Sequence, residues 1–181
     1  MTDLEDLYRE IILDHYRSPR NRGELESPPA RRVEGFNPLC GDEIVLTLLV
    51  GDHQVTDIKF AGSGCSISQS SASLMSSAVK GKTLPEVRAL IRTFKSMMSI
   101  HEASLDPEGP GASGEGPDDA AAARSEEAGN GLADLRQLGE LAALQGVVKF
   151  PVRIKCATLG WNALAQALDE IGDEIGDEIG A

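Results

Sequence analysis

A stretch of 26 residues in the second half of this chain holds no side chain that can build a hydrophobic core. Residues 106–131 contain no Val, Ile, Leu, Met, Phe, Trp or Tyr. Such a segment cannot offset its ordering entropy by burying apolar surface. We therefore expect a mobile acidic loop over residues 102–131. The core must come from the residues on either side of it.

The residues before this loop predict a helix, a small antiparallel sheet and two more helices. Apolar residues at helical spacing predict a helix that begins near Leu4 and ends before Pro19. Two β-branched runs, 43–50 and 54–62, predict a hairpin, and residues 31–39 favour a strand before it. Residues 66–81 and 83–100 predict helices, the second with Thr83 as its N-cap.

The residues after the loop predict two helices and a tail. Leucines stand at every third position from Leu132 to Leu144, which we interpret as a helix wedged between other elements. The last helix is expected to begin near Cys156. Residues 169–181 repeat the motif DEIG and predict a frayed, solvated tail, because glycine costs a helix about 1 kcal/mol relative to alanine. The predicted organisation is one domain, 1–168, followed by this tail.

The acidic charge of the chain is local. The net charge is −12, but residues 102–131 carry eight acids and one base, and residues 169–181 carry six acids and no base. The remaining residues are nearly neutral, and only 4% of the chain is aromatic. A nucleic-acid-binding surface would need a basic, aromatic face, so nucleic acid is not an expected partner. Arginines near the N-terminus favour an acidic protein partner instead.

The sequence also indicates the cellular compartment. It has no run of 18 apolar residues and its acidic N-terminus lacks the apolar core of a signal peptide, so we expect no membrane and a cytoplasmic location. Cytosolic thiols stay reduced, and an odd number of cysteines argues further against a disulfide framework. Metal binding or catalysis is the better interpretation of the three cysteines.

All three cysteines fall at predicted element junctions. Cys40 precedes a strand, Cys65 lies between a glycine turn and a helix, and Cys156 opens the last predicted helix. A helix N-terminus stabilises a thiolate. Asp42 stands two residues after Cys40, and three thiolates with one carboxylate make a four-coordinate set of the kind that zinc accepts.

Alternatives remain open at this level. Cys65 and Cys156 can be plain buried thiols, because free cysteine is commonly buried. A Cys–His nucleophile would need His15, His53 or His101. We interpret His53 and His101 as surface residues and His15 as a packing or capping residue. Since no C-x₂-C pair is present, spacing alone does not decide for a shared metal site.

Four stretches together carry a resemblance to a known family: LYREIILDHYRSPRNRG, NPLCGDEI, FAGSGCSISQSSASLM and PVRIKCATLGW. In this order they resemble the NifU-N/IscU superfamily of iron–sulfur assembly proteins, and within it the SufU branch of zinc-dependent sulfurtransferases. The resemblance covers residues 4–100 and 132–168. It implies an α+β fold with a three-stranded, mainly antiparallel sheet and five to six helices. It also implies that one zinc ion is bound by Cys40, Asp42, Cys65 and Cys156.

The resemblance further implies an activity and its partners. In SufU-like proteins, a pyridoxal-phosphate cysteine desulfurase of the SufS type supplies persulfide sulfur, which is passed on to iron–sulfur cluster assembly. By position, Cys40 is the implied acceptor. Asp42, Cys65 and Cys156 would then hold the metal throughout. Arg153 is implied to help dock the partner or to stabilise the freed thiolate.

Two other functions stay open beside the sulfur carrier. One is a scaffold on which a [2Fe–2S] cluster is assembled, because thiolates are the usual cluster ligands. IscU-type scaffolds have LPPVKxHC before the third cysteine, whereas residues 149–156 are KFPVRIKC, with Lys155 in place of the histidine. A protonated lysine cannot be a ligand, which favours the carrier. The other is a zinc-stabilised interaction domain without chemistry.

Overall fold

The computed structural model describes residues 3–99 and 136–179, with side chains up to residue 172. The predicted acidic loop 102–131 and His101 lie outside these residues. The division of the chain into a domain of residues 1–168 and a separate tail stays a prediction.

The described residues form a three-stranded antiparallel sheet and five helices, in the predicted order. The sheet order is β1-β2-β3, so each strand pairs with its neighbour in sequence. This confirms the predicted hairpin, the preceding strand and the α+β class. The elements are α1 Asp3–Arg17, β1 Arg31–Asn37, β2 Asp42–Gly51, β3 Gln54–Ser63, α2 Ser66–Val79, α3 Leu84–Ser99, the 3₁₀ helix η1 Gly139–Lys149, and α5 Pro151–Ile179.

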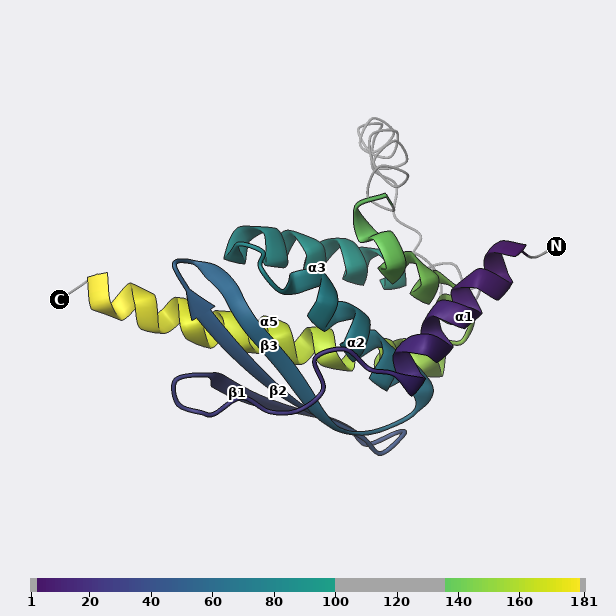
Figure 1. The fold of residues 1–181 in the computed structure, drawn as a ribbon, viewed down its shortest axis with the longest axis horizontal. Helices are drawn as coiled ribbons and strands as arrows, with labels where there is room; N and C mark the ends of the chain where they lie inside the picture. The colour runs from purple at the N-terminus through teal and green to yellow at the C-terminus, as the bar shows by residue number, and fades with distance from the viewer. Residues whose placement is uncertain (1–2, 100–135, 180–181) are drawn as a thin grey trace, which may run out of the picture.

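The helices pack around α5, which runs along the sheet and contacts β1 and β2 (Figure 1). Helix α2 lies between α1 and α5, and α3 and η1 also contact α5. None of the helices in the described part of the chain combines the length and apolarity that a bilayer crossing demands.

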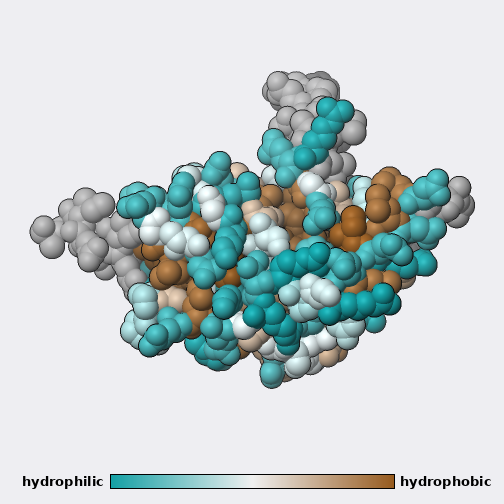
Figure 2. All heavy atoms as spheres, in the orientation of Figure 1, coloured by the Kyte–Doolittle hydropathy of each residue, from teal (hydrophilic) through white to brown (hydrophobic). Residues whose placement is uncertain are grey.

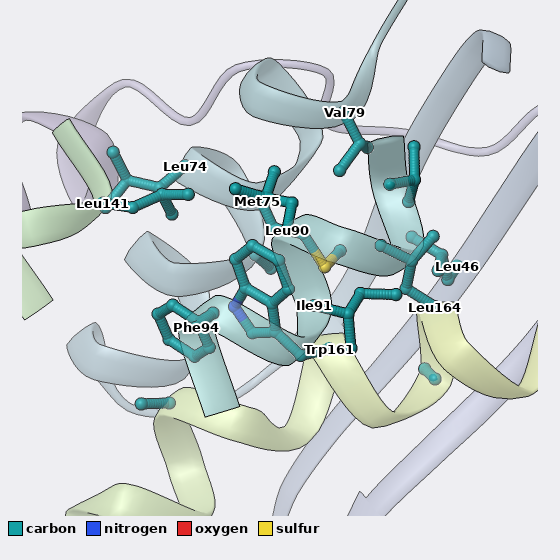
Figure 3. Packing of buried hydrophobic residues seen from close by; sticks show 14 of the residues in the cluster. Leu46, Leu74, Met75, Val79, Leu90, Ile91, Phe94, Leu141, Trp161 and Leu164 are labelled. Atoms are coloured by element: carbon teal, nitrogen blue, oxygen red, sulfur yellow. The ribbon is translucent and has the colours of Figure 1, made fainter. Parts of the chain in front are cut away.

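The core is centred on Trp161 of α5 (Figure 3). Its ring stacks on Phe94 of α3, with centroids 4.2 Å apart and planes inclined by 12°. The indole N–H donates to the Ser71 hydroxyl at 3.2 Å, and that hydroxyl donates to the carbonyl of Ala157 at 2.6 Å. These bonds satisfy the buried polar atoms and fix α2 against α5. They therefore set the relative position of the elements that carry Cys65 and Cys156.

The helix predicted over the leucine repeat is of a different type. The described part of this segment has α-helical residues at 136–138 and then a 3₁₀ helix over Gly139–Lys149. A 3₁₀ helix has three residues per turn, so side chains three apart line up on one side. Leu138, Leu141, Leu144 and Val147 are accordingly all buried. The period of three in the sequence was the signal of this geometry.

The last helix is longer at both ends than predicted. It begins at Pro151, where proline suits the first helical position, and not near Cys156. It also continues through the DEIG repeats to Ile179, where the sequence predicted a frayed tail. The first repeat is anchored on both sides, by Asp169 to Arg88 at 2.8 Å and by Glu170 to Arg31 at 3.8 Å.

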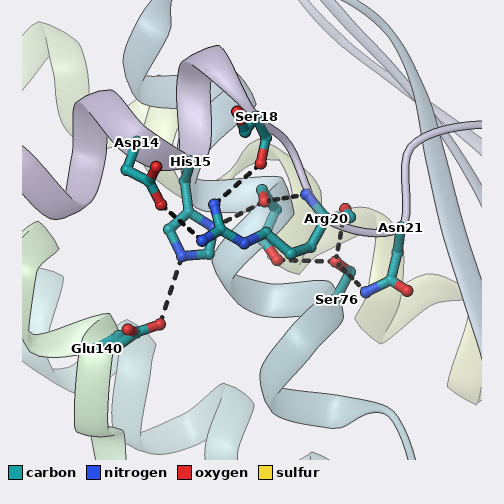
Figure 4. Close-up of polar contacts among 8 residues, drawn as sticks. Asp14, His15, Ser18, Arg20, Asn21, Ser76 and Glu140 are labelled. Carbon is teal, nitrogen blue, oxygen red and sulfur yellow. Dashed lines mark hydrogen bonds and ion pairs between the residues drawn. The ribbon is translucent and has the colours of Figure 1, made fainter.

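A buried histidine joins the first helix to α2 and η1 (Figure 4). His15 Nδ1 lies 2.7 Å from the Ser73 hydroxyl, and Nε2 lies 3.4 Å from a Glu140 carboxylate oxygen. The neutral ring satisfies both contacts, with Nδ1 accepting and Nε2–H donating. The expected packing role of His15 is confirmed. His53 is exposed in the β2–β3 turn, as expected.

We predict that His15 makes the fold sensitive to mild acid. Burial lowers the pKa of His15, as does the charge of Arg20, while Glu140 and Asp14 act in the opposite direction. Below its unfolded pKa of about 6.5, the unfolded chain binds a proton that the folded chain resists, so the unfolding free energy falls as pH falls. This contribution is at most about 1.4 kcal/mol per pH unit.

Denaturant unfolding between about pH 7.5 and 5.5, with zinc in excess, measures this effect. His15→Gln should be less stable near neutral pH but lose less stability on acidification than the wild type. An equal pH dependence of the two proteins would contradict the prediction.

Candidate metal centre

Cys40 is carried by the tight connection between β1 and β2. The last residue pair of these strands is Asn37 and Asp42, which closes the connection at its base. The Gly41 N–H donates to the Asn37 carbonyl at 2.8 Å. Gly41 has a φ of 68°, in the left-handed region that glycine adopts without strain. This turn leaves Cys40 exposed while Asp42 is buried.

Cys65 is the N-cap of α2, as its place after the glycine turn predicted. Its sulfur accepts from the Ser68 N–H at 3.5 Å, and its own N–H donates to Asp42 Oδ1 at 2.9 Å. Gly64 is required by this contact, because a Cβ there would lie 2.7 Å from Asp42 Oδ1. The turn before α2 is thereby fixed against the start of β2.

Cys156 lies in the second turn of α5 and not at its N-terminus, so the predicted stabilisation of its thiolate by free helix N–H groups is wrong. The residue is buried. Its sulfur lies 3.2 Å from Cys40 Sγ and 3.8 Å from the amide nitrogen of Asn37. The helix therefore brings the third cysteine to the first, 116 residues apart in the sequence.

Three of the four predicted ligands form one compact group. One ligand atom each of Cys40, Asp42 and Cys156 lies within 4.8 Å of the others. Cys65 is not one of these three, but its sulfur lies 3.8 Å from Asp42 Oδ2. Asp42 thus joins Cys40 and Cys156 to Cys65, the cap of α2.

Charge and burial shape the chemistry of the group. Burial raises the pKa of the Cys156 thiol, and hydrogen bonds with Asp42 and Cys40 raise it further. A metal ion must therefore displace a proton from Cys156 when it binds. A hydrogen bond with Cys65 raises the pKa of Arg153, and the charge of Cys65 acts in the same direction. The positive charge of Arg153 therefore lies beside the Cys65 sulfur.

The donor set fits zinc. Zinc prefers four tetrahedral ligands, and at a Zn–S length of about 2.3 Å two ligand atoms lie about 3.8 Å apart. The separation of 3.8 Å between Cys65 Sγ and Asp42 Oδ2 matches this value, whereas the sulfurs of Cys40 and Cys156, 3.2 Å apart, would have to separate to hold the ion. Cys40, Asp42, Cys65 and Cys156 are the residues that would hold the ion.

Sequence reasoning missed Asn37. It is buried at the base of the turn, and its side chain contacts both the turn and Cys156. Its position directly before Pro38 is a turn signal, but nothing in the sequence places it beside a cysteine 119 residues away.

Comparison with known proteins shows the family of this chain. Residues 7–112 match the model of the NifU-like N-terminal domain. The chain belongs to this family. The match spans the Cys40–Asp42 turn and the Cys65 cap.

Two relatives and one solved structure place the chain within the NifU-like family. It is 40% identical over 92% of both chains to the zinc-dependent sulfurtransferase SufU of Bacillus subtilis. It is 36% identical to the iron–sulfur cluster assembly scaffold protein IscU of Streptococcus pyogenes, covering 93% of this chain and 86% of the relative. The crystal structure of FiSufU from Fervidobacterium islandicum superposes with a TM-score of 0.66 at 28% identity, covering 88% of this chain and 94% of the other.

Proposed function

We propose that this chain is a zinc-dependent sulfur carrier that accepts persulfide sulfur on Cys40 for iron–sulfur cluster assembly. The observation that carries the proposal is the exposure of Cys40 at the edge of a compact Cys–Asp–Cys group whose other members are buried. One thiol can leave such a group while the rest stays in place. The likeness to a zinc-dependent sulfurtransferase supports the same function.

The chemistry follows from the thiol that is free to move. The Cys40 thiolate attacks the terminal sulfur of a persulfide on the donor protein. The donor's S–S bond breaks, its cysteine leaves as a thiolate, and Cys40 becomes a persulfide. Zinc, when bound, supplies thiolate stabilisation without redox chemistry of its own. Arg153, which contacts Cys65, supplies positive charge beside the freed thiolate.

The proposed sulfur donor is a pyridoxal-phosphate cysteine desulfurase of the SufS type. The surface around the site suits a protein partner, because large apolar side chains next to the ligands are exposed by 60–65%: Phe36, Leu39, Phe150 and Val152. Downstream iron–sulfur assembly proteins would take the sulfur. We place this exchange in the cytoplasm, where thiols stay reduced.

The second candidate function is a scaffold on which a [2Fe–2S] cluster is assembled by the same residues. The similarity to an IscU scaffold protein supports this alternative. The side chain at position 155 favours the carrier. Lys155 is exposed one residue before Cys156, where IscU-type scaffolds have a histidine, and a lysine ammonium offers no lone pair to iron.

Metal analysis of anaerobically purified protein tests the proposal. We expect one zinc per chain, no iron-dependent visible absorbance, and stimulation of a SufS-type desulfurase on addition of the protein. Bound iron with a visible absorbance band would instead establish the scaffold. Stoichiometric zinc without stimulation of the desulfurase would leave a zinc-stabilised interaction domain.

A further inference from the structure

Asn37 links the turn that carries Cys40 to the buried Cys156. We propose that Asn37 is a positioning residue that retains Cys156 in the metal site, so that Cys40 is the thiolate released to accept sulfur. This inference rests on the proposed function, because it explains which of two paired thiols departs.

The side chain of Asn37 makes two contacts at once. Its Oδ1 accepts from the Leu39 N–H at 3.2 Å, and its Nδ2 lies 3.8 Å from Cys156 Sγ as a donor. Because Oδ1 is engaged by an N–H group, the amide NH₂ must be the end that faces the sulfur. Asn37 is only 5% exposed, so water does not compete for this contact.

The three cysteines differ in the donors that reach their sulfurs. Cys65 receives the Ser68 N–H and contacts Arg153, and Cys156 receives the Asn37 amide. In the described part of the chain, Cys40 Sγ accepts its hydrogen bond from the Cys156 thiol. An N–H donor orients a thiolate ligand and draws off part of its negative charge. Among the described residues, Cys65 and Cys156 therefore each have an N–H donor that Cys40 lacks.

The position of Asn37 in the sheet makes this support rigid. It is the last paired residue of β1, opposite Asp42, and its carbonyl accepts from Gly41. The residues that move with Cys40 lie within this four-residue connection. Asn37 thus separates a fixed part of the site, which holds Asp42 and Cys156, from a turn that can shift.

The test variant is Asn37→Asp. Aspartate keeps the side-chain acceptor for the Leu39 N–H but turns a carboxylate oxygen toward Cys156 Sγ. Loss of an outer-shell partner of a metal ligand costs about 10–100-fold in metal affinity, and we expect a loss of this size in competition with a chromophoric chelator. With Co²⁺ in place of zinc, the thiolate-to-cobalt charge-transfer band should weaken or shift.

The cysteine that carries the persulfide is a second measurement. If Asn37 only stabilised the fold, its replacement would not change which cysteine is modified. The wild type, incubated with a SufS-type desulfurase and cysteine, should carry persulfide on Cys40 by mass spectrometry of its peptides. The Asn37→Asp protein should carry it on Cys156 as well. Asn162→Asp, on the exposed side of α5, makes the same change of charge and should behave as the wild type.

Asn37→Ser covers the case in which Asn37→Asp does not fold. Serine keeps a short acceptor for the turn without added charge, and it cannot reach Cys156 with an N–H. Wild-type metal affinity, cobalt spectrum and persulfide site in a folded Asn37 variant would overturn the inference. If the wild type accepts no sulfur at all, the proposed function fails. In that case the metal affinity and the cobalt spectrum of the Asn37 variants still test whether Asn37 retains Cys156 in the metal site.

Discussion

Replacing Cys40 with alanine should abolish persulfide acceptance and leave the packing of the core intact. Cys40 is exposed on a turn, so its loss creates no cavity in the core. The other two sulfurs are held by donors and by the body of the protein. Cys65 caps α2, and Cys156 is buried in α5. Neither should reach a persulfide on a partner while the contacts that hold its sulfur are intact.

The measurement is peptide mass spectrometry after incubation with a SufS-type desulfurase and cysteine, together with the rate of sulfide release. Cys40→Ser tests the same point with a side chain of nearly the same shape, whose hydroxyl is a far weaker nucleophile toward persulfide sulfur. Ser96→Ala, at an exposed position of α3, serves as the matched control. Persulfide on Cys65 or Cys156 of the Cys40→Ala protein would refute the assignment of Cys40 as the acceptor.

The sheet and most helices were predictable because their signals are local. The β-branched runs that became β2 and β3 are joined by a two-residue turn, so their pairing follows from chain order. Thr83 begins α3 as predicted, in a reciprocal capping arrangement with Glu86. Such features depend on residues within a few positions of one another.

Two predicted helices differ from the structure, and each difference has a local physical cause. The predicted start of the last helix near Cys156 lies five residues too late, because Pro151 is a helix-start residue as well as part of the PVRIKC motif. Leucines three apart were interpreted as a drifting α-helical stripe, although a spacing of three also fits a 3₁₀ helix. Both errors concern the segments that surround Cys156.

The site itself was predictable only in part. Cys40, Asp42 and Cys65 could be named because each stands at an element junction or beside a glycine, whereas Cys156 lies inside α5 and is implied as a ligand by the family resemblance. Their contacts join residues far apart in the chain, such as Cys65 with Asp42 and Cys156 with Cys40. A sequence carries no direct record of such distances. The contact between Asn37 and Cys156 could not be predicted for the same reason.

Replacing Asp42 should cause the largest loss of metal binding and of fold stability. Its carboxylate lies in the group with Cys40 and Cys156, and it also accepts from the Cys65 N–H at 2.9 Å. Removing a direct ligand should cost more than the roughly 10–100-fold that an outer-shell partner costs. Because metal binding is coupled to folding, the melting temperature with zinc should fall as well.

Two substitutions separate the charge of Asp42 from its hydrogen bond. Asp42→Asn keeps an oxygen that can accept from Cys65, so it should weaken zinc binding while the metal-free protein stays close to the wild type. Asp42→Ala also leaves a buried N–H without its acceptor, at a cost of about 1–3 kcal/mol. The metal-free Asp42→Ala protein should therefore be less stable than metal-free Asp42→Asn.

Chelator competition gives the zinc affinity. Unfolding without and with chelator gives the stability of the zinc-bound and of the metal-free protein. Asp6→Ala, at an exposed position of α1, controls for the loss of one carboxylate. If chelator does not change the melting temperature of the wild type, zinc is not coupled to this fold and the ligand role of Asp42 is wrong. If Asp42→Asn binds zinc as tightly as the wild type, the metal is held by the three cysteines and Asp42 acts only through the Cys65 N–H.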